Sequence, residues 1–140
     1  MKMVKLIPGR RGSGKTKLLI EAIRNALNES KGNVVTIQIG NSLNTQISAR
    51  EARLINVEDY GIAGCYSMYG FASGIMASDY DCTHIFVDGI LRIIRDDRQD
   101  LDKIATMLDK LDKVSSDSTV VTFTYSADVS EIPEQIRKYL

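Results

Sequence analysis

A glycine-rich, basic segment between two apolar stretches constrains the local fold more than any other feature of the chain. The segment is PGRRGSGKT, residues 8–16, with three glycines, three cations and two hydroxyl side chains. The apolar run before it, residues 3–7, predicts a strand that ends at Pro8. Over residues 18–27 apolar side chains recur at helical spacing with polar ones opposite, which predicts an amphipathic helix. The sequence therefore predicts a strand, a tight loop and a helix in immediate succession.

The rest of the chain continues this alternation. Further strands are predicted over residues 34–39, 53–57, 84–87 and 119–125. Further helices are predicted over residues 45–52, over 67–77, from Asp100 to Leu111 and from Pro133 onward. Apolar strands that alternate with helices are typical of a parallel sheet covered on both faces. We therefore expect one α/β domain over residues 1–140, with a mostly parallel sheet between two helical layers.

Composition limits the class of protein. The chain has 140 residues, of which 44% are hydrophobic, and its 18 cations balance 18 anions. This balance argues against a protein that coats nucleic acid or an anionic membrane, so we expect neither as a partner. Cys65 and Cys82 lack metal-site spacing, and we interpret them as buried hydrophobes in a reducing compartment. Without a signal peptide or a run of about 18 apolar residues, a cytoplasmic location is expected.

The glycine-rich segment matches the pattern G-x-x-x-x-G-K-S/T in full. Glycines let such a loop curl until its backbone N–H groups surround phosphate oxygens, and the following helix directs its positive end at the anion. Lys15 can then reach the β- and γ-phosphates, and the Thr16 hydroxyl can bind Mg²⁺. The predicted nucleotide site comprises Gly9, Arg10, Arg11, Gly12, Ser13, Gly14, Lys15 and Thr16. At the variable positions, Arg10 and Arg11 either add charge near the phosphates or are solvated, and we favour solvation.

On this motif the chain resembles the P-loop NTPase superfamily, and a second motif extends the resemblance. Residues 84–88 look like a Walker B strand, an apolar run that ends in Asp88. The resemblance implies a three-layer P-loop NTPase fold of RecA-like or thymidine-kinase-like type, with ATP and Mg²⁺ as ligands. It also implies that Thr16 and Asp88 hold the metal, and that Lys15 and Asp88 are the catalytic residues. More weakly, residues 119–124 resemble a γ-phosphate-sensing strand, with Thr124 or Ser126 as the sensor.

One part of the hydrolysis apparatus is missing. Gly89 stands where many ATPases of this superfamily carry a glutamate that polarises the attacking water. Glu51 and Glu58 are the nearest acidic candidates by region, and we interpret both as solvated loop residues. We therefore expect slow intrinsic hydrolysis. The alternating cations and anions of residues 92–100 are interpreted as a solvated ion-pair run rather than as a lid over the site.

The sequence leaves three functions open. The favoured one is a small ATP-binding protein that hydrolyses the nucleotide slowly, or faster when a protein partner or a second copy joins it. The second is a small-molecule or nucleoside kinase, whose acceptor pocket would come from residues 41–80. Five aromatic side chains concentrate there: Tyr60, Tyr66, Tyr69, Phe71 and Tyr80. The third is a non-catalytic interaction protein whose contacts depend on the bound nucleotide.

Overall fold

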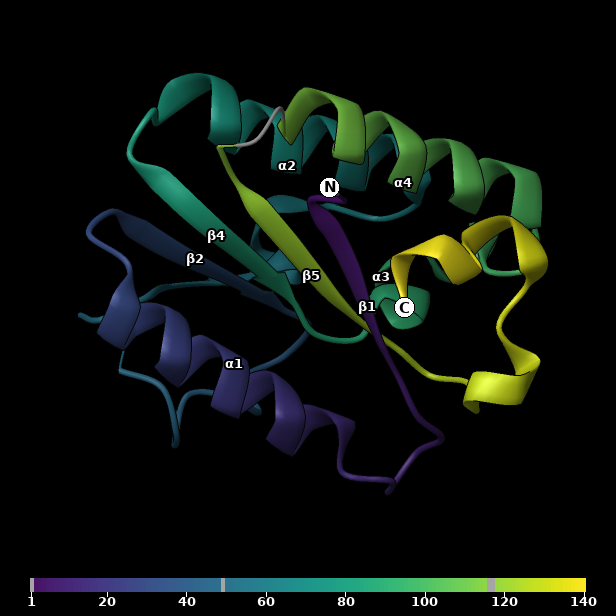
Figure 1. Ribbon diagram of the computed structural model, residues 1–140, viewed down its shortest axis with the longest axis horizontal. Coiled ribbons are helices and arrows are strands. Elements are labelled where there is room, and N and C mark those ends of the chain that lie inside the picture. The colour runs from purple at the N-terminus through teal and green to yellow at the C-terminus, as the bar shows by residue number, and fades with distance from the viewer. Residues whose placement is uncertain (1, 49, 116–117) are drawn as a thin grey trace.

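A five-stranded, all-parallel sheet forms the centre of the computed structural model, which describes residues 2–48, 50–115 and 118–140 (Figure 1). In chain order the strands are β1 (Val4–Pro8), β2 (Asn33–Gln38), β3 (Arg53–Asn56), β4 (Cys82–Val87) and β5 (Val120–Tyr125). In space their order is β1-β5-β4-β2-β3. The α-helices are α1 (Lys15–Glu29), α2 (Cys65–Ser78), α3 (Ile90–Ile93) and α4 (Leu101–Ser115). The 3₁₀ segments are η1 (Val57–Tyr60), η2 (Arg95–Asp97), η3 (Val129–Glu131) and η4 (Glu134–Tyr139).

The helices cover both faces of the sheet, with α1 on one face and α2 and α4 on the other (Figure 1). Leu19 and Ile23 of α1 are fully buried in a cluster that includes Phe86 of β4. On the opposite face, α2 and α4 pack in a larger cluster that includes Ile85 and Phe123. Successive strand residues point to opposite faces. Burial on both faces therefore explains why these strands are almost continuously apolar, and the predicted parallel α/β sheet is confirmed.

The five predicted strands are all present within one to two residues of their expected bounds. The helices predicted after the loop, at 67–77 and after Asp100 are also present, but α1 begins three residues earlier and α4 ends four residues later than expected. The segment predicted as a helix from Pro133 onward is the 3₁₀ helix η4. The short helix expected over residues 45–52 is wrong: residues 42–46 form turns, and residue 49 lies outside the described residues. Side-chain bonds explain the difference. The buried Gln38 donates through Nε2 to Asn44 Oδ1 at 2.6 Å and accepts the N–H of Leu43 at 3.0 Å. These bonds fix the loop in place of a helical ladder.

The strand that leads into the glycine-rich loop lies at one edge of the sheet and is fixed at both ends. At its start, Asp112 Oδ1 of α4 accepts the N–H groups of Met3 at 2.6 Å and Val4 at 3.1 Å. At its end, the N–H of Gly9 donates to the carbonyls of Tyr125 at 3.2 Å and Ala127 at 2.8 Å. The loop is thereby tied to the segment that follows β5. Across the described part of the chain, no helix has the length and apolar character of a membrane span.

Candidate functional site

The carboxyl ends of β1, β4 and β5 border a cleft of about 740 Å³. Its wall is built from the glycine-rich loop, the start of α1, the turn after β4 and the segment after β5. The residues that line it are Arg10, Arg11, Gly12, Lys15, Thr16, Asp88, Gly89, Arg92, Arg98, Thr124, Ser126, Ala127 and Glu131. Five of the eight predicted loop residues therefore face the same space as Asp88, which is far from them in the sequence, whereas Gly9, Ser13 and Gly14 do not line the cleft. Open parallel sheets place ligands at this edge.

The loop presents the amino end of α1 to this cleft. Gly14 precedes the helix with φ of 91°, in the left-handed region where glycine is strongly favoured, and no side chain of the described residues caps the helix there. The N–H of Ser13 donates to the Arg10 carbonyl at 3.0 Å, which closes the turn. The first backbone N–H groups of a helix lack partners within it, and they carry the positive end of the helix dipole. This end of α1 can therefore accept an anion.

Asp88 is held by a short hydrogen-bond chain at the end of β4. The hydroxyl of Thr124, a fully buried residue, donates to Asp88 Oδ1 at 2.8 Å, and it accepts the N–H of Gly89 at 2.6 Å. Asp88 follows the end of β4. Thr124 lies on the face of β5 toward α1, the helix that carries Thr16, because Phe123 before it belongs to the cluster on the opposite face. The single proton of the Thr124 hydroxyl is thereby directed to Asp88, whereas Ser126, the other residue predicted as a γ-phosphate sensor, also lines the cleft. Thr124 therefore orients the Asp88 carboxylate.

The residue after Asp88 is Gly89, and its backbone conformation disfavours a side chain. Gly89 has φ of 81°, which a residue with a Cβ adopts only with strain. A Cβ built there would lie 3.7 Å from Cδ of Arg92, an ordinary van der Waals contact, so the backbone conformation and not a lack of space disfavours a side chain. Where many ATPases of the resembled superfamily place a carboxylate, this chain has no side chain, and Arg92 lines the cleft three residues further on. A guanidinium stays protonated and cannot act as a base toward water.

The solvated ion-pair run predicted over residues 92–100 is correct in its solvation and wrong in its pairing, since Arg92, Arg95 and Arg98 are exposed. Among the described residues, Arg92, Arg95 and Arg98 form no salt bridge, and Arg92 and Arg98 line the cleft instead. Asp97 bonds away from them: it accepts the N–H of Cys65 at 2.8 Å and pairs with Lys103 at 3.2 Å. The Cys65 bond and then Lys103 lower the pKa of Asp97. Arg92 and Arg98 are thus site residues that the sequence argument missed.

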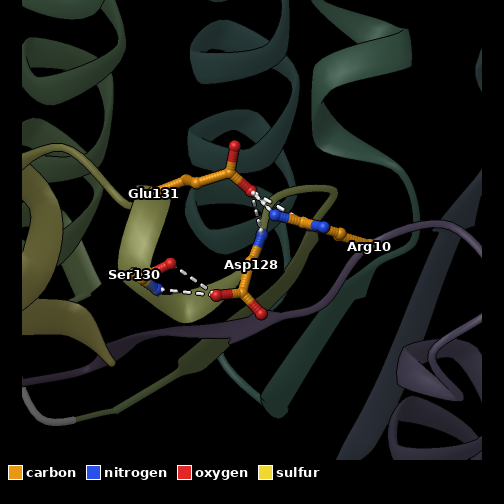
Figure 2. Close-up of polar contacts among 4 residues, drawn as sticks. All are labelled: Arg10, Asp128, Ser130 and Glu131. Atoms are coloured by element: carbon orange, nitrogen blue, oxygen red, sulfur yellow. Dashed lines mark hydrogen bonds and ion pairs between the residues drawn. The ribbon is translucent and has the colours of Figure 1, made fainter.

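Arg10 is anchored to the segment after β5 (Figure 2). Glu131 Oε1 accepts Arg10 Nε at 3.2 Å and the Asp128 N–H at 3.3 Å. Asp128 Oδ2 in turn accepts the Ser130 hydroxyl at 2.6 Å and the Ser130 N–H at 3.1 Å. The hydroxyl bond is the main cause of a lowered pKa at Asp128. The Arg10 and Glu131 side chains remain 70% and 55% exposed, so the expected solvation of Arg10 holds alongside a specific partner.

This ion pair yields the first mutational prediction. Replacing Glu131 with glutamine should tighten ATP binding about two- to fivefold at low salt, because it removes a carboxylate from the cleft and releases Arg10 toward the phosphates. Titration of wild type and Glu131→Gln with a fluorescent ATP analogue at two salt concentrations measures the change. Glu134→Gln is the matched control, since Glu134 is an exposed acid that does not line the cleft. Equal affinities for both variants would show that the pair has no effect on the site.

The donor set of the cleft suits Mg²⁺ only in part. Within the described ranges, no group of three histidine, cysteine or acidic side chains could enclose a metal ion. The cleft does contain the Thr16 hydroxyl and the Asp88 carboxylate. Mg²⁺ commonly takes one or two protein oxygens, with phosphate oxygens and water completing its octahedron. These two residues fit that kind of site, in which the metal arrives with its phosphate ligand.

Other candidates from the sequence lie elsewhere. Glu51 does not line the cleft, and Glu58 lines a separate hollow. The aromatic side chains expected around an acceptor pocket do not gather at the cleft. Tyr66 and Tyr69 line a groove between α2 and α4, Tyr80 is 97% exposed, and Tyr60 stacks on Phe71. These five aromatic side chains therefore do not line the cleft, and an acceptor pocket built from residues 41–80 stays a prediction.

Comparison with known proteins does not assign the chain to a family. No protein-family model matches the chain, and no curated protein matches it.

Proposed function

We propose that this chain is a P-loop protein that binds ATP together with Mg²⁺. The observation that carries the proposal is the meeting, in one cleft, of the complete G-x-x-x-x-G-K-S/T loop at the amino end of α1 with Asp88 at the end of β4. A strand, such a loop and a helix form the usual phosphate cradle of this superfamily. The parallel α/β sheet supports the proposal, since its strand ends bring both motifs to the same edge.

Each residue of the cleft then has a distinct task. Backbone N–H groups of the loop and of the first turn of α1 hold the phosphates, and Lys15 adds a charge at the β- and γ-positions. Thr16 and, through water, Asp88 hold Mg²⁺, which neutralises charge on the phosphate oxygens. Arg11, Arg92 and Arg98 add positive potential to the same space. The cleft is therefore suited to a highly charged anion.

Efficient hydrolysis is not part of the proposal. Of the described residues that line the cleft, only Asp88 and Glu131 are carboxylates. Thr124 binds one oxygen of Asp88, and Arg10 binds Glu131. Neither carboxylate occupies the position after Asp88, where many ATPases of the resembled superfamily carry the glutamate that polarises water, because that position is Gly89. We propose that the protein holds ATP with slow turnover, and that a protein partner or a second copy supplies the missing group.

A nucleotide titration tests this proposal. We expect ATP to bind more tightly than ADP, and Mg²⁺ to strengthen ATP binding. Phosphate release from the same sample should fall well below about 1 per second, the low end of ordinary enzyme turnover. GTP in place of ATP measures base selectivity. Binding of no nucleotide, with or without Mg²⁺, would overturn the proposal, and rapid hydrolysis by the chain alone would overturn its account of turnover.

A further inference from the structure

A second, smaller hollow lies beside the cleft and shares one of its residues. It measures about 280 Å³ and is bordered by Ile39 after β2, by η1 and the turn that follows, and by α3 and η2. We call it the side pocket. Arg92 lines both the cleft and the side pocket, whereas Arg95 lines the side pocket alone. The side pocket is therefore the immediate neighbour of the space assigned to the nucleotide.

The lining of the side pocket combines an apolar surface with charged groups. Its apolar part comes from Ile39, Val57, Ile62 and Ile93. Its charged groups are Arg92, Arg95 and Glu58, all on exposed residues and without a salt bridge among the residues described. Guanidinium groups bind phosphate and carboxylate oxygens in pairs. Glu58 can accept a hydrogen bond from a hydroxyl group.

Size restricts the ligand further. Pockets for drug-sized ligands span about 300–1,000 Å³, so a pocket of this volume suits a molecule with few carbon atoms. An apolar surface lined also by two arginines and one glutamate complements a short carbon skeleton that carries an anionic group and a hydroxyl. Small sugar phosphates and polyol phosphates have this chemistry.

From these features we infer that the side pocket binds a small, hydroxyl-bearing phosphate monoester next to the nucleotide. Arg95 binds its phosphate, the isoleucine surface contacts its carbon skeleton, and Glu58 accepts a hydrogen bond from its hydroxyl group. Arg92 lines both spaces and therefore contributes to the binding of both ligands. The inference depends on the proposed function only for the identity of the neighbouring ligand, because Arg95 and Glu58 do not line the nucleotide cleft.

The test follows backbone amides of the ¹⁵N-labelled protein by NMR. Glycerol 3-phosphate and ribose 5-phosphate are the probes, with glycerol and inorganic phosphate as controls, and each is titrated with and without Mg²⁺ and a non-hydrolysable ATP analogue. We expect at least one probe to shift the amides of Gly61, Ile62 and Ala63 more strongly than either control. Arg95→Ala should weaken this binding about tenfold or more while leaving analogue affinity unchanged.

Two further variants separate the sites. Arg98→Ala should weaken the analogue and leave the probe unaffected, whereas Arg92→Ala should weaken both. The inference is overturned if neither probe shifts the side-pocket amides at about 10 mM, a concentration that detects even millimolar binding. It is also overturned if Arg95→Ala binds the probe as tightly as wild type. Failure of the analogue to shift the amides of Gly12 and Gly14 would overturn the proposed function instead, so the two failures are distinguishable.

Discussion

Replacing Lys15 with alanine should weaken Mg–ATP binding about 10- to 150-fold. Lys15 is half-buried at the first position of α1 and lines the cleft that the glycine-rich loop borders. A hydrogen bond to a charged partner contributes about 1.5–3 kcal/mol, which corresponds to that range of affinities. The loop backbone and the amino end of α1 remain, so residual binding through N–H groups is expected. Calorimetric titration of both proteins with the non-hydrolysable ATP analogue measures the loss.

The matched control is Lys17→Ala. Lys17 lies two residues further along α1, is exposed and does not line the cleft. Its removal changes the net charge equally and should alter affinity less than about twofold, because exposed charges at a distance are screened. Thermal unfolding of both variants checks that the fold is intact. If Lys15→Ala bound the analogue as tightly as wild type, or if both lysine variants lost affinity equally, the proposed phosphate site would be wrong.

Local patterns in the sequence predicted the elements of this fold but not their arrangement. Apolar runs identify strands buried on both faces, and the spacing over residues 18–27 identifies a helix. The order of the strands could not be predicted in this way. β1 pairs with β5, near the other end of the chain, and the sequence of neither strand indicates its partner. The loop held by Gln38 shows the same limit: its hydrogen bonds to residues 43 and 44 replace a helix that the local pattern allowed.

The same distinction applies to the cleft. The loop motif specifies its own geometry, because its glycines and Lys15 act within a few residues of one another, and a strand-ending Asp88 reaches the same edge in any parallel sheet of this kind. Arg92 and Arg98 could not be recognised in this way. Their alternation with acidic residues is typical of a solvated run. Only the turns of α3 and η2, together with the bonds that direct Asp97 toward α2, separate these arginines from the acids.

The pairing of Thr124 with Asp88 leads to the second large effect. Asp88→Ala should reduce ATP affinity about 10- to 100-fold with Mg²⁺ present, the range typical of residues that hold a metal through water. With EDTA the change should be less than about twofold, because the loop and Lys15 bind the phosphates without Asp88. Thr124 loses its acceptor in this variant. Asp88→Asn is therefore the conservative counterpart, since its Oδ1 can still accept the Thr124 hydroxyl while the negative charge is lost.

A double-mutant cycle with Thr16→Val shows whether the two side chains act on one ion. Both residues line the cleft from different elements, Thr16 from α1 and Asp88 from the turn after β4. If they hold the same Mg²⁺, either substitution removes most of the metal-dependent affinity. The double variant should then bind ATP only slightly more weakly than the single variant of lower affinity. Fully additive losses would place them in separate roles. If Asp88→Ala lost the same ATP affinity with Mg²⁺ as with EDTA, Asp88 would not be a residue of the metal site. A residue that acts through Mg²⁺ does not affect binding when the metal is absent.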